Sequence, residues 1–239
     1  MLDEENGSQE YIKVIQYIYR LIDAGTLEVG SKLPTERSIA GQLGIGRNST
    51  REALSILHGM GIIERRQGSG NYVSGDAGRS IGQIILMMVA LKRISHAEIC
   101  EFRRSMEKTV CSTIVKKGLS GERRLILKDC LEKLEDEEAE LLRCSVSERN
   151  ACLAGLAAAD DDFHNELVKA ADNGLMAVIM DAVTQVYKDS IERVIYNADE
   201  ELRAELMECH RNIYDGMISG DYEAVEKAID RHYDIIIIK

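Results

Sequence analysis

Proline, tryptophan and other aromatic residues are scarce in this chain of 239 residues, which has one Pro, no Trp and 5% aromatic residues in total. Proline is the residue that interrupts helices most strongly, and the sequence is instead rich in Ala, Leu, Ile, Glu, Lys and Arg, so the composition predicts a mainly α protein. The chain is 45% hydrophobic and 30% charged, which excludes disorder on compositional grounds and allows a sizeable core.

A hydrophobic run long enough to cross a membrane is also missing. The apolar run 84–91 ends at Lys92 and Arg93, whereas a transmembrane helix needs about 20 apolar residues. The first five residues are acidic and lack the basic-then-apolar pattern of a signal peptide. These absences predict a cytoplasmic protein with no membrane partner.

Cysteine motifs of the CxxC type are absent, although the chain has six cysteines. All six lie beyond residue 91, in segments with helical periodicity: Cys100, Cys111, Cys130, Cys144, Cys152 and Cys209. In a cytosolic protein such residues act mainly as small buried hydrophobic groups, and a disulfide or thiolate metal site is the alternative.

The net charge of −11 is unevenly distributed. Residues 11–75 hold eight Lys or Arg against five Asp or Glu, whereas residues 76–239 hold 22 against 32. A small basic module is therefore joined to a large acidic one, and the basic module remains a candidate for nucleic-acid binding despite the acidic total.

The basic module has the pattern of a winged helix-turn-helix. We expect helices over 11–24, 36–43 (with Thr35 as N-cap) and about 48–60, followed by short strands at 62–66 and 71–73. Gly44 and Gly46 break the chain between the second and third helices. Basic and polar side chains that can contact bases and phosphates surround this break: Arg37, Arg47, Asn48, Ser49, Thr50 and Arg51. The alternative is a solvated basic face on a small helical subdomain.

A glycine-containing stretch follows, with Gly75, Gly78 and Gly82, before apolar periodicity resumes at Ile84. We therefore predict a DNA-binding domain at 1–75, a linker and connecting helix at 76–94, and a helical domain at 95–239. The expected helices, about seven, are 82–93, 95–117, 121–143, 147–172, 174–196, 199–219 and 221–237, with Ser120 and Ser147 as caps.

Three histidines of the acidic module form a possible metal site with one aspartate. Asp160 and His164 are four residues apart and so share one helix face, while His210 and His232 lie on two later helices. These four groups could converge in a bundle as a divalent-metal site. Spacing alone favours the alternative, which is a solvated acidic run and three isolated histidines.

Residues 10–75 resemble the DNA-binding domain of GntR-family bacterial regulators. The matching segments are Leu33 to Arg37, Leu43-Gly44, Arg47 to Leu54, Gly61 to Ile63 and Arg65 to Gly70. The resemblance implies that Arg37, Arg47 and Arg51 are the main contacts to the groove and phosphates. It places Asn48 and Ser49 in the polar pair beside them, and Gln67 and Gly68 at a wing tip in the minor groove. Gly46 departs from the family, which commonly has Ser or Thr there.

Residues 95–235 resemble the FCD effector domain of the FadR subfamily. The matching motifs are Glu101-Phe102-Arg103, Asp160-x-x-x-His164 with Phe163 and Asn173, and His210 with Gly220-Asp221 leading to His232. The resemblance implies that Asp160, His164, His210 and His232 bind a divalent metal, with Zn²⁺ first and Ni²⁺ or Mn²⁺ as alternatives. It also implies that Arg103 binds a small carboxylate effector.

The sequence thus predicts a ligand-responsive transcription regulator that binds an inverted-repeat operator in double-stranded DNA as a homodimer. No catalytic residue is expected. Two other functions remain open: a sensor in which the metal ion itself is the signal, and a metal-dependent hydrolase or lyase, for which no general base is identifiable.

Overall fold

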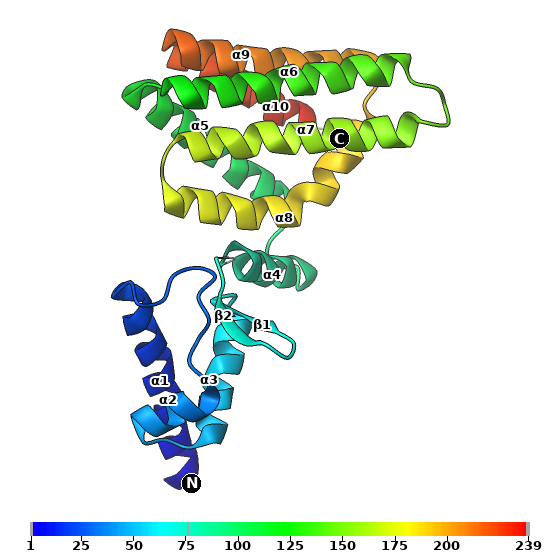
Figure 1. Cartoon of the computed structure of the whole chain (residues 1–239). Helices are drawn as coiled ribbons and strands as arrows, with labels where there is room; N and C mark the ends of the chain where they lie inside the picture. The colour runs from blue at the N-terminus through cyan, green and yellow to red at the C-terminus, as the bar shows by residue number, and fades with distance from the viewer. Residues whose placement is uncertain (1, 76, 238–239) are drawn as a thin grey trace. The chain divides into compact units, whose positions relative to one another are not determined.

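The computed structural model describes residues 2–75 and 77–237, and the chain divides into two compact units, Met1–Ile81 and Gly82–Lys239 (Figure 1). The first unit contains three helices and a two-stranded hairpin, and the second is helical throughout its described part. The predicted mainly α fold class is confirmed. No helix in the described part of the chain is both long and apolar enough to span a membrane.

The first unit is a winged helix-turn-helix. Its elements are α1 (Leu2–Asp23), α2 (Glu36–Leu43), α3 (Arg47–Gly59), β1 (Ile63–Arg66) and β2 (Gly70–Val73). Helix α1 begins nine residues before the expected Tyr11, because residues 2–10 contain helix-forming Leu, Glu and Gln but no apolar periodicity that would reveal them. The unit's core is formed by Val14, Ile18, Leu33, Ile39, Ala53, Leu54, Leu57, Ile63 and Val73.

The turn between α2 and α3 depends on two local interactions. The Thr35 hydroxyl accepts a hydrogen bond from the Ser38 backbone N–H and caps α2, as predicted. Gly44 ends α2 in the left-handed region, with φ of 65°, which other residues adopt at a cost. Helix α3 then starts from Gly46, which provides no side-chain cap.

Beta strands β1 and β2 pair antiparallel, with Ile63 opposite Val73 and Arg66 opposite Gly70. Gly68 lies at the tip of this wing with φ of 71°. Ile63 and Val73 lie in the core, whereas Arg65 and Arg66, nearer the tip of the hairpin, are exposed to solvent.

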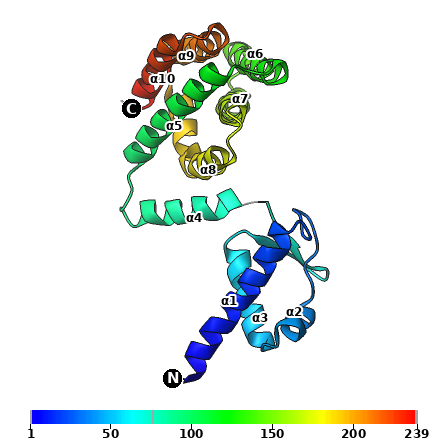
Figure 2. The same cartoon turned by 90° about the vertical axis from the view of Figure 1, so that its left-hand side faces the viewer.

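The second unit is a bundle of long helices that pack side by side (Figures 1 and 2). They are α5 (His96–Lys117), α6 (Gly121–Arg143), α7 (Arg149–Ala170), α8 (Gly174–Asn197), α9 (Glu200–Ser219) and α10 (Tyr222–Ile237), preceded by α4 (Ala77–Ala90). Helix α5 packs against α7, α8, α9 and α10, and it therefore lies at the centre of the contacts that enclose the bundle interior.

Two expectations for the second half need correction. Helix α4 begins at Ala77, five residues before the expected start at 82, so Gly78 and Gly82 lie inside the helix. Each glycine weakens the helix by only about 1 kcal/mol relative to alanine, so the helix tolerates both. Gly82 also lies close to a neighbouring helix, since a Cβ at this position would be 3.1 Å from the carbonyl oxygen of Ala182. Ser147 does not cap α7, whose N-cap is Glu148. The expected cap at Ser120 is confirmed.

The cysteines are free thiols. Cys100, Cys111, Cys152 and Cys209 are buried, and Cys130 and Cys144 are partly buried. Buried Cys111 has a pKa raised well above its usual value, because burial disfavours the thiolate. The expectation that cysteines serve mainly as small hydrophobic groups is confirmed for the four buried ones.

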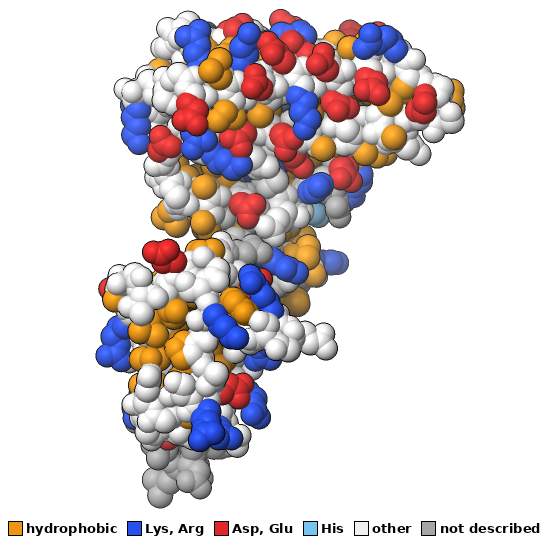
Figure 3. Space-filling model, in the orientation of Figure 1, with side chains coloured by type: hydrophobic (Ala, Val, Ile, Leu, Met, Phe, Trp, Pro, Cys, Tyr) orange, Lys and Arg blue, Asp and Glu red, His pale blue; other side chains and the backbone are white. Residues whose placement is uncertain are grey.

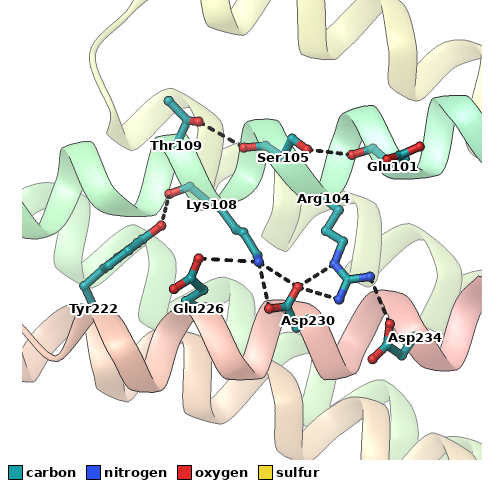
Figure 4. A network of polar contacts seen from close by, with 9 residues as sticks. All are labelled: Glu101, Arg104, Ser105, Lys108, Thr109, Tyr222, Glu226, Asp230 and Asp234. Carbon is teal, nitrogen blue, oxygen red and sulfur yellow. Dashed lines mark hydrogen bonds and ion pairs between the residues drawn. The ribbon is translucent and has the colours of Figure 1, made fainter.

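An ion-pair network joins α5 to α10 (Figure 4). The Lys108 ammonium lies 2.7 Å from Asp230, and the Arg104 guanidinium bridges Asp230 and Asp234, with 2.9 Å from its Nη1 to the Asp234 Oδ1. Partial burial would raise the pKa of Asp230, but the hydrogen bonds from Lys108 and Arg104 outweigh it and lower the pKa. This network fixes the last helix against the centre of the bundle.

We expect Asp230→Asn to lower the free energy of unfolding at pH 7 by about 1 kcal/mol, as for a partly exposed ion-pair network. Since the pKa of Asp230 is lowered in the folded state, its contribution is present above the unfolded-state pKa and is lost as pH falls through the folded-state value. Since the ordinary pKa of Asp is about 3.9, urea unfolding should therefore give a smaller difference from wild type at about pH 2.5 than at pH 7. Glu223→Gln, which removes only a pair with Lys227 on the same helix, is the control. An equal loss in both variants would contradict the role of the network.

Candidate metal centre and nucleic-acid interface

Three helices bring four buried polar side chains together inside the bundle. Asp160 and His164 come from α7, His210 from α9 and His232 from α10. One ligand atom from each lies within 4.8 Å of the corresponding atoms of the other three. The structure therefore brings the four groups of the predicted metal site together, and it does so in a pocket of the core, where each is at most 7% exposed.

The distances between these atoms suit a divalent ion. The Nε2 atoms of His210 and His164 are 3.2 Å apart, and the His210 Nε2 is 3.2 Å from the Asp160 Oδ1. Two ligands of a tetrahedral Zn²⁺, each at about 2.0–2.1 Å, lie about 3.3–3.4 Å from each other. Three imidazoles and one carboxylate are donors that Zn²⁺, Ni²⁺ and Mn²⁺ accept. The four side chains therefore fit the divalent metal ion that the sequence predicted.

The charges of this cluster are unusual for a protein interior. Burial would raise the pKa of Asp160, but the hydrogen bond from His210 and the three imidazoles outweigh it and lower the pKa. Burial and the neighbouring imidazoles lower the pKa of His232 well below its usual value. Burial also opposes protonation of His164, but Glu107 and Asp160 outweigh it and raise the pKa of that ring. The cluster thus keeps one carboxylate ionised and one imidazole neutral.

Arg103, which the sequence predicted as a carboxylate partner, lies beside the cluster and is 2% exposed. Its Nη2 is 3.6 Å from the Glu107 Oε1, and its guanidinium lies 5.0 Å from the ring centre of Tyr187. The other nitrogens, Nε and Nη1, have no hydrogen-bond partner among the described residues. Buried donors without a partner are costly, so these two atoms are free to bind an added acceptor.

Two residues at this site were missed from the sequence. Glu107 contacts both Arg103 and His164, and Tyr187 lies against Arg103. Glu107 follows Arg103 by four residues, so helical spacing offered a signal for it. Nothing in the sequence indicated Tyr187, which reaches the site from α8 through packing alone.

In the first unit, basic side chains line the exposed surface of α2, α3 and the wing. Arg37 on α2 and Arg47, Asn48 and Arg51 on α3 are exposed. Arg51 forms an ion pair with Glu36, at 3.3 Å. On the face shown in Figure 3, this unit shows more Lys and Arg than Asp and Glu side chains, in agreement with the excess of basic residues in 11–75.

Ser49 and Asn48, which were predicted together as DNA contacts, have different surroundings. The Ser49 hydroxyl donates a hydrogen bond of 2.7 Å to the Glu10 carboxylate and ties α3 to α1. Asn48 is exposed and makes no such contact in the described part of the chain. Gln67 and Gly68 are exposed at the wing tip, as expected.

A groove of about 440 Å³ separates the wing from α3 and is lined in part by Arg51, Arg65, Arg66 and Gln67. Arg65 donates to the Ser55 hydroxyl on α3, and Arg66 stacks over the Tyr72 ring at 4.1 Å. These two arginines of β1 were not among the DNA contacts predicted from the sequence, although they lie in a segment that resembles the family.

Comparison with known proteins agrees with this architecture. Residues 10–73 match the model of bacterial regulatory proteins of the gntR family, and residues 98–234, more than half of the chain, match the FCD domain. The chain is a GntR-family regulator with an FCD domain. The winged unit is therefore its DNA-binding domain, and the helical bundle is its effector domain.

Relatives of this regulator are transcription regulators from other bacteria. The HTH-type transcriptional regulator LutR of Bacillus subtilis (strain 168) is 26% identical over 215 residues, which cover 89% of this chain and 92% of LutR. A protein of Escherichia coli (strain K12), provisionally named as an L-lactate dehydrogenase operon regulatory protein, is 26% identical over 94% of this chain and 83% of its own length. The fold resembles that of a Streptococcus agalactiae GntR structure, with a TM-score of 0.71, 22% identity, and coverage of 95% of this chain and 98% of that one.

Proposed function

We propose that this GntR-family regulator binds a divalent metal ion through Asp160, His164, His210 and His232 and responds to a small organic acid bound there. The observation that carries the proposal is the convergence of these four ligand atoms within 4.8 Å in the core. Buried polar side chains without a common partner would destabilise an apolar bundle. A shared ion gives all four a partner at once.

The acid is held at two points in this proposal. Three neutral imidazoles and one carboxylate leave a divalent ion with a net positive charge, and the bound ion supplies a Lewis acid for an oxygen ligand. The unpartnered Nε and Nη1 of Arg103 bind a second oxygen of the acid. One relative is named as a regulatory protein of an L-lactate dehydrogenase operon, so lactate is the first acid to test.

The DNA contacts that we propose are Arg37, Arg47, Asn48 and Arg51, with Gln67 and Gly68 at the wing tip. All six are exposed. An arginine at the start of α3 can form two hydrogen bonds to guanine, and Asn48 can do so to adenine. We assign Ser49 to holding α3 against α1, with phosphate contact as a secondary role, because its hydroxyl already donates to Glu10.

A catalytic role for the metal site has little support. A hydrolase or lyase needs a positioned base that is free to act near the metal. Asp162 forms an exposed pair with Lys133, at 2.7 Å, and the buried Glu107 already contacts His164, Tyr233 and Arg103. We therefore propose that the regulator is not an enzyme. A sensor whose signal is the metal alone uses the same ligands, and the titration below separates it from a sensor of an acid.

Replacing Arg47 with alanine should weaken operator binding by about 1–3 kcal/mol and relax base preference, because a bidentate contact to a base is lost. The measurement is a titration of a labelled operator and of variants with single base changes. Lys32→Ala, which also removes one positive charge, should leave the base preference unchanged. Equal operator affinity for wild type and Arg47→Ala would refute the assignment of α3 as the helix that contacts the bases.

Two substitutions should separate metal binding from the response to acids. His210→Ala should lose most of the bound metal while the fold survives, whereas Arg103→Ala should keep the metal and lose the response to acids. Metal content is measured after dialysis, and operator affinity is titrated with Zn²⁺ alone and then with Zn²⁺ plus lactate and other hydroxy and keto acids. A full response to Zn²⁺ alone would favour the metal sensor.

Metal affinity should also fall as pH drops, because each imidazole must be neutral to bind. The pKa of His164 is raised by Glu107 and Asp160, so protons compete for that ligand first. If His210→Ala keeps full metal, or Arg103→Ala answers every acid as wild type does, the proposed sensor is wrong.

We further propose that the regulator binds an inverted repeat as a homodimer, in which α4 contacts its copy. Ile84, Met87, Met88 and Leu91 follow helical spacing and are 65%, 60%, 37% and 62% exposed. The chain carries no charged residue from Ser80 to Leu91. Such a stripe suits a two-fold contact, since no like charges meet, and exposed apolar stripes of this kind mark interfaces.

Met87→Glu with Leu91→Glu should therefore convert a dimer to a monomer in sedimentation experiments and reduce operator affinity. Leu125→Glu, which changes a leucine of 63% exposure on α6, is the matched control and should leave the dimer intact. A wild-type chain that is monomeric at operator saturation would exclude the homodimer. A charged double variant that remains dimeric would exclude α4 as the contact.

A further inference from the structure

Glu107 places a carboxylate inside the bundle without being one of the four converging ligands. It is 1% exposed and lies on α5, one turn after Arg103. Its Oε1 is 3.1 Å from the His164 Nδ1, accepts a hydrogen bond of 2.7 Å from the Tyr233 hydroxyl, and is 3.6 Å from the Arg103 Nη2. Burying a carboxylate is costly, so its partners define what it does.

The contact with His164 determines which ring nitrogen carries the proton. A carboxylate only accepts hydrogen bonds, so its oxygen at 3.1 Å favours a proton on this nitrogen, although the ring orientation in the structure does not complete a hydrogen bond. With the proton on Nδ1, the lone pair of the neutral ring is on Nε2. That atom lies 3.2 Å from the His210 Nε2 and 4.0 Å from the Asp160 Oδ2, on the side where the ligand atoms converge.

The other two histidines lack such a partner. The Nδ1 atoms of all three histidines are buried and complete no hydrogen bond among residues 2–75 and 77–237, but only that of His164 lies beside a carboxylate oxygen, at 3.1 Å. His164 is therefore the one ligand of the set, within the described chain, whose outer nitrogen faces a carboxylate. Metal-binding histidines commonly depend on such a group for their tautomer, orientation and basicity.

We infer that Glu107 is a positioning residue that holds His164 in the Nδ1–H tautomer, with Nε2 directed at the metal ion, and that joins this ligand to Arg103. The inference rests on the metal site of the proposed function. Because the same oxygen contacts His164 on α7, Tyr233 on α10 and Arg103 on α5, one carboxylate connects the metal side of the site to its acid-binding side.

Metal affinity is the first readout. Glu107→Gln should bind Zn²⁺ about 10-fold more weakly than wild type in competition with a chromophoric chelator, and Glu107→Leu up to about 100-fold more weakly. The Gln variant keeps an acceptor oxygen and nearly the same volume, so it tests the charge even if the Leu variant fails to fold. Glu101→Gln makes the same change at an exposed position of the same helix and should bind Zn²⁺ as wild type does.

The tautomer is the second readout, and a merely structural role would not change it. Long-range ¹H–¹⁵N spectra of the metal-free wild type, recorded at a pH at which the His164 ring is neutral, should show its proton on Nδ1, and Glu107→Leu should show a mixture of both tautomers. Tyr233→Phe keeps the carboxylate and should keep the Nδ1–H form.

The outcomes separate the two proposals. Failure of wild type to bind Zn²⁺ would overturn the proposed metal site, and His164 with its proton on Nε2 in wild type would overturn the inference. If wild type binds Zn²⁺ and Glu107→Gln binds it equally well, the metal site stands and the inference is wrong.

Discussion

The structure of the effector domain depends on the burial of charge in an apolar bundle. Asp160, Glu107 and Arg103 are enclosed together with three imidazoles, all nearly inaccessible to solvent. Each of these groups is stable there only because the others lie within a few ångströms. The pKa of Glu107 illustrates the balance, since burial raises it but His164 and Arg103 outweigh that effect and lower it to about 2. A missing partner would leave an uncompensated charge in the core.

The same constraint links the site to the helices around it. Helices α5, α7, α9 and α10 each contribute at least one buried polar group, so a change in the site acts on four helices. The Lys108 and Arg104 pairs with Asp230 hold α10, which carries His232, against α5, which carries Arg103 and Glu107 (Figure 4). An acid that binds both the ion and Arg103 would therefore add a connection between helices that already share one network. A ligand can alter DNA binding only through such a difference in affinity between two arrangements.

The DNA-binding domain follows a different principle, because its functional groups are exposed and held by local structure. Thr35 and Gly44 define the ends of α2, and the hydrogen bond between Ser49 and Glu10 holds α3 against α1. These short-range interactions leave Arg47 and Arg51 on the surface at the start of α3. Because the helix is held in place, these side chains start from fixed backbone positions, which lowers the cost of making specific contacts with base edges.

Helix positions, the hairpin and the pairing of Asp160 with His164 were determined by the sequence, because apolar periodicity, caps and glycines act over a few residues. Local pattern misled at residues 2–10 of α1, at Gly78 and Gly82 in α4, and at Ser147, which does not cap α7. The meeting of His164 with His210 and His232, and the placement of Glu107 and Tyr187 beside them, were decided by tertiary structure. These residues are up to 125 positions apart in the chain, and only the packing of α5, α7, α8, α9 and α10 specifies which of their faces meet.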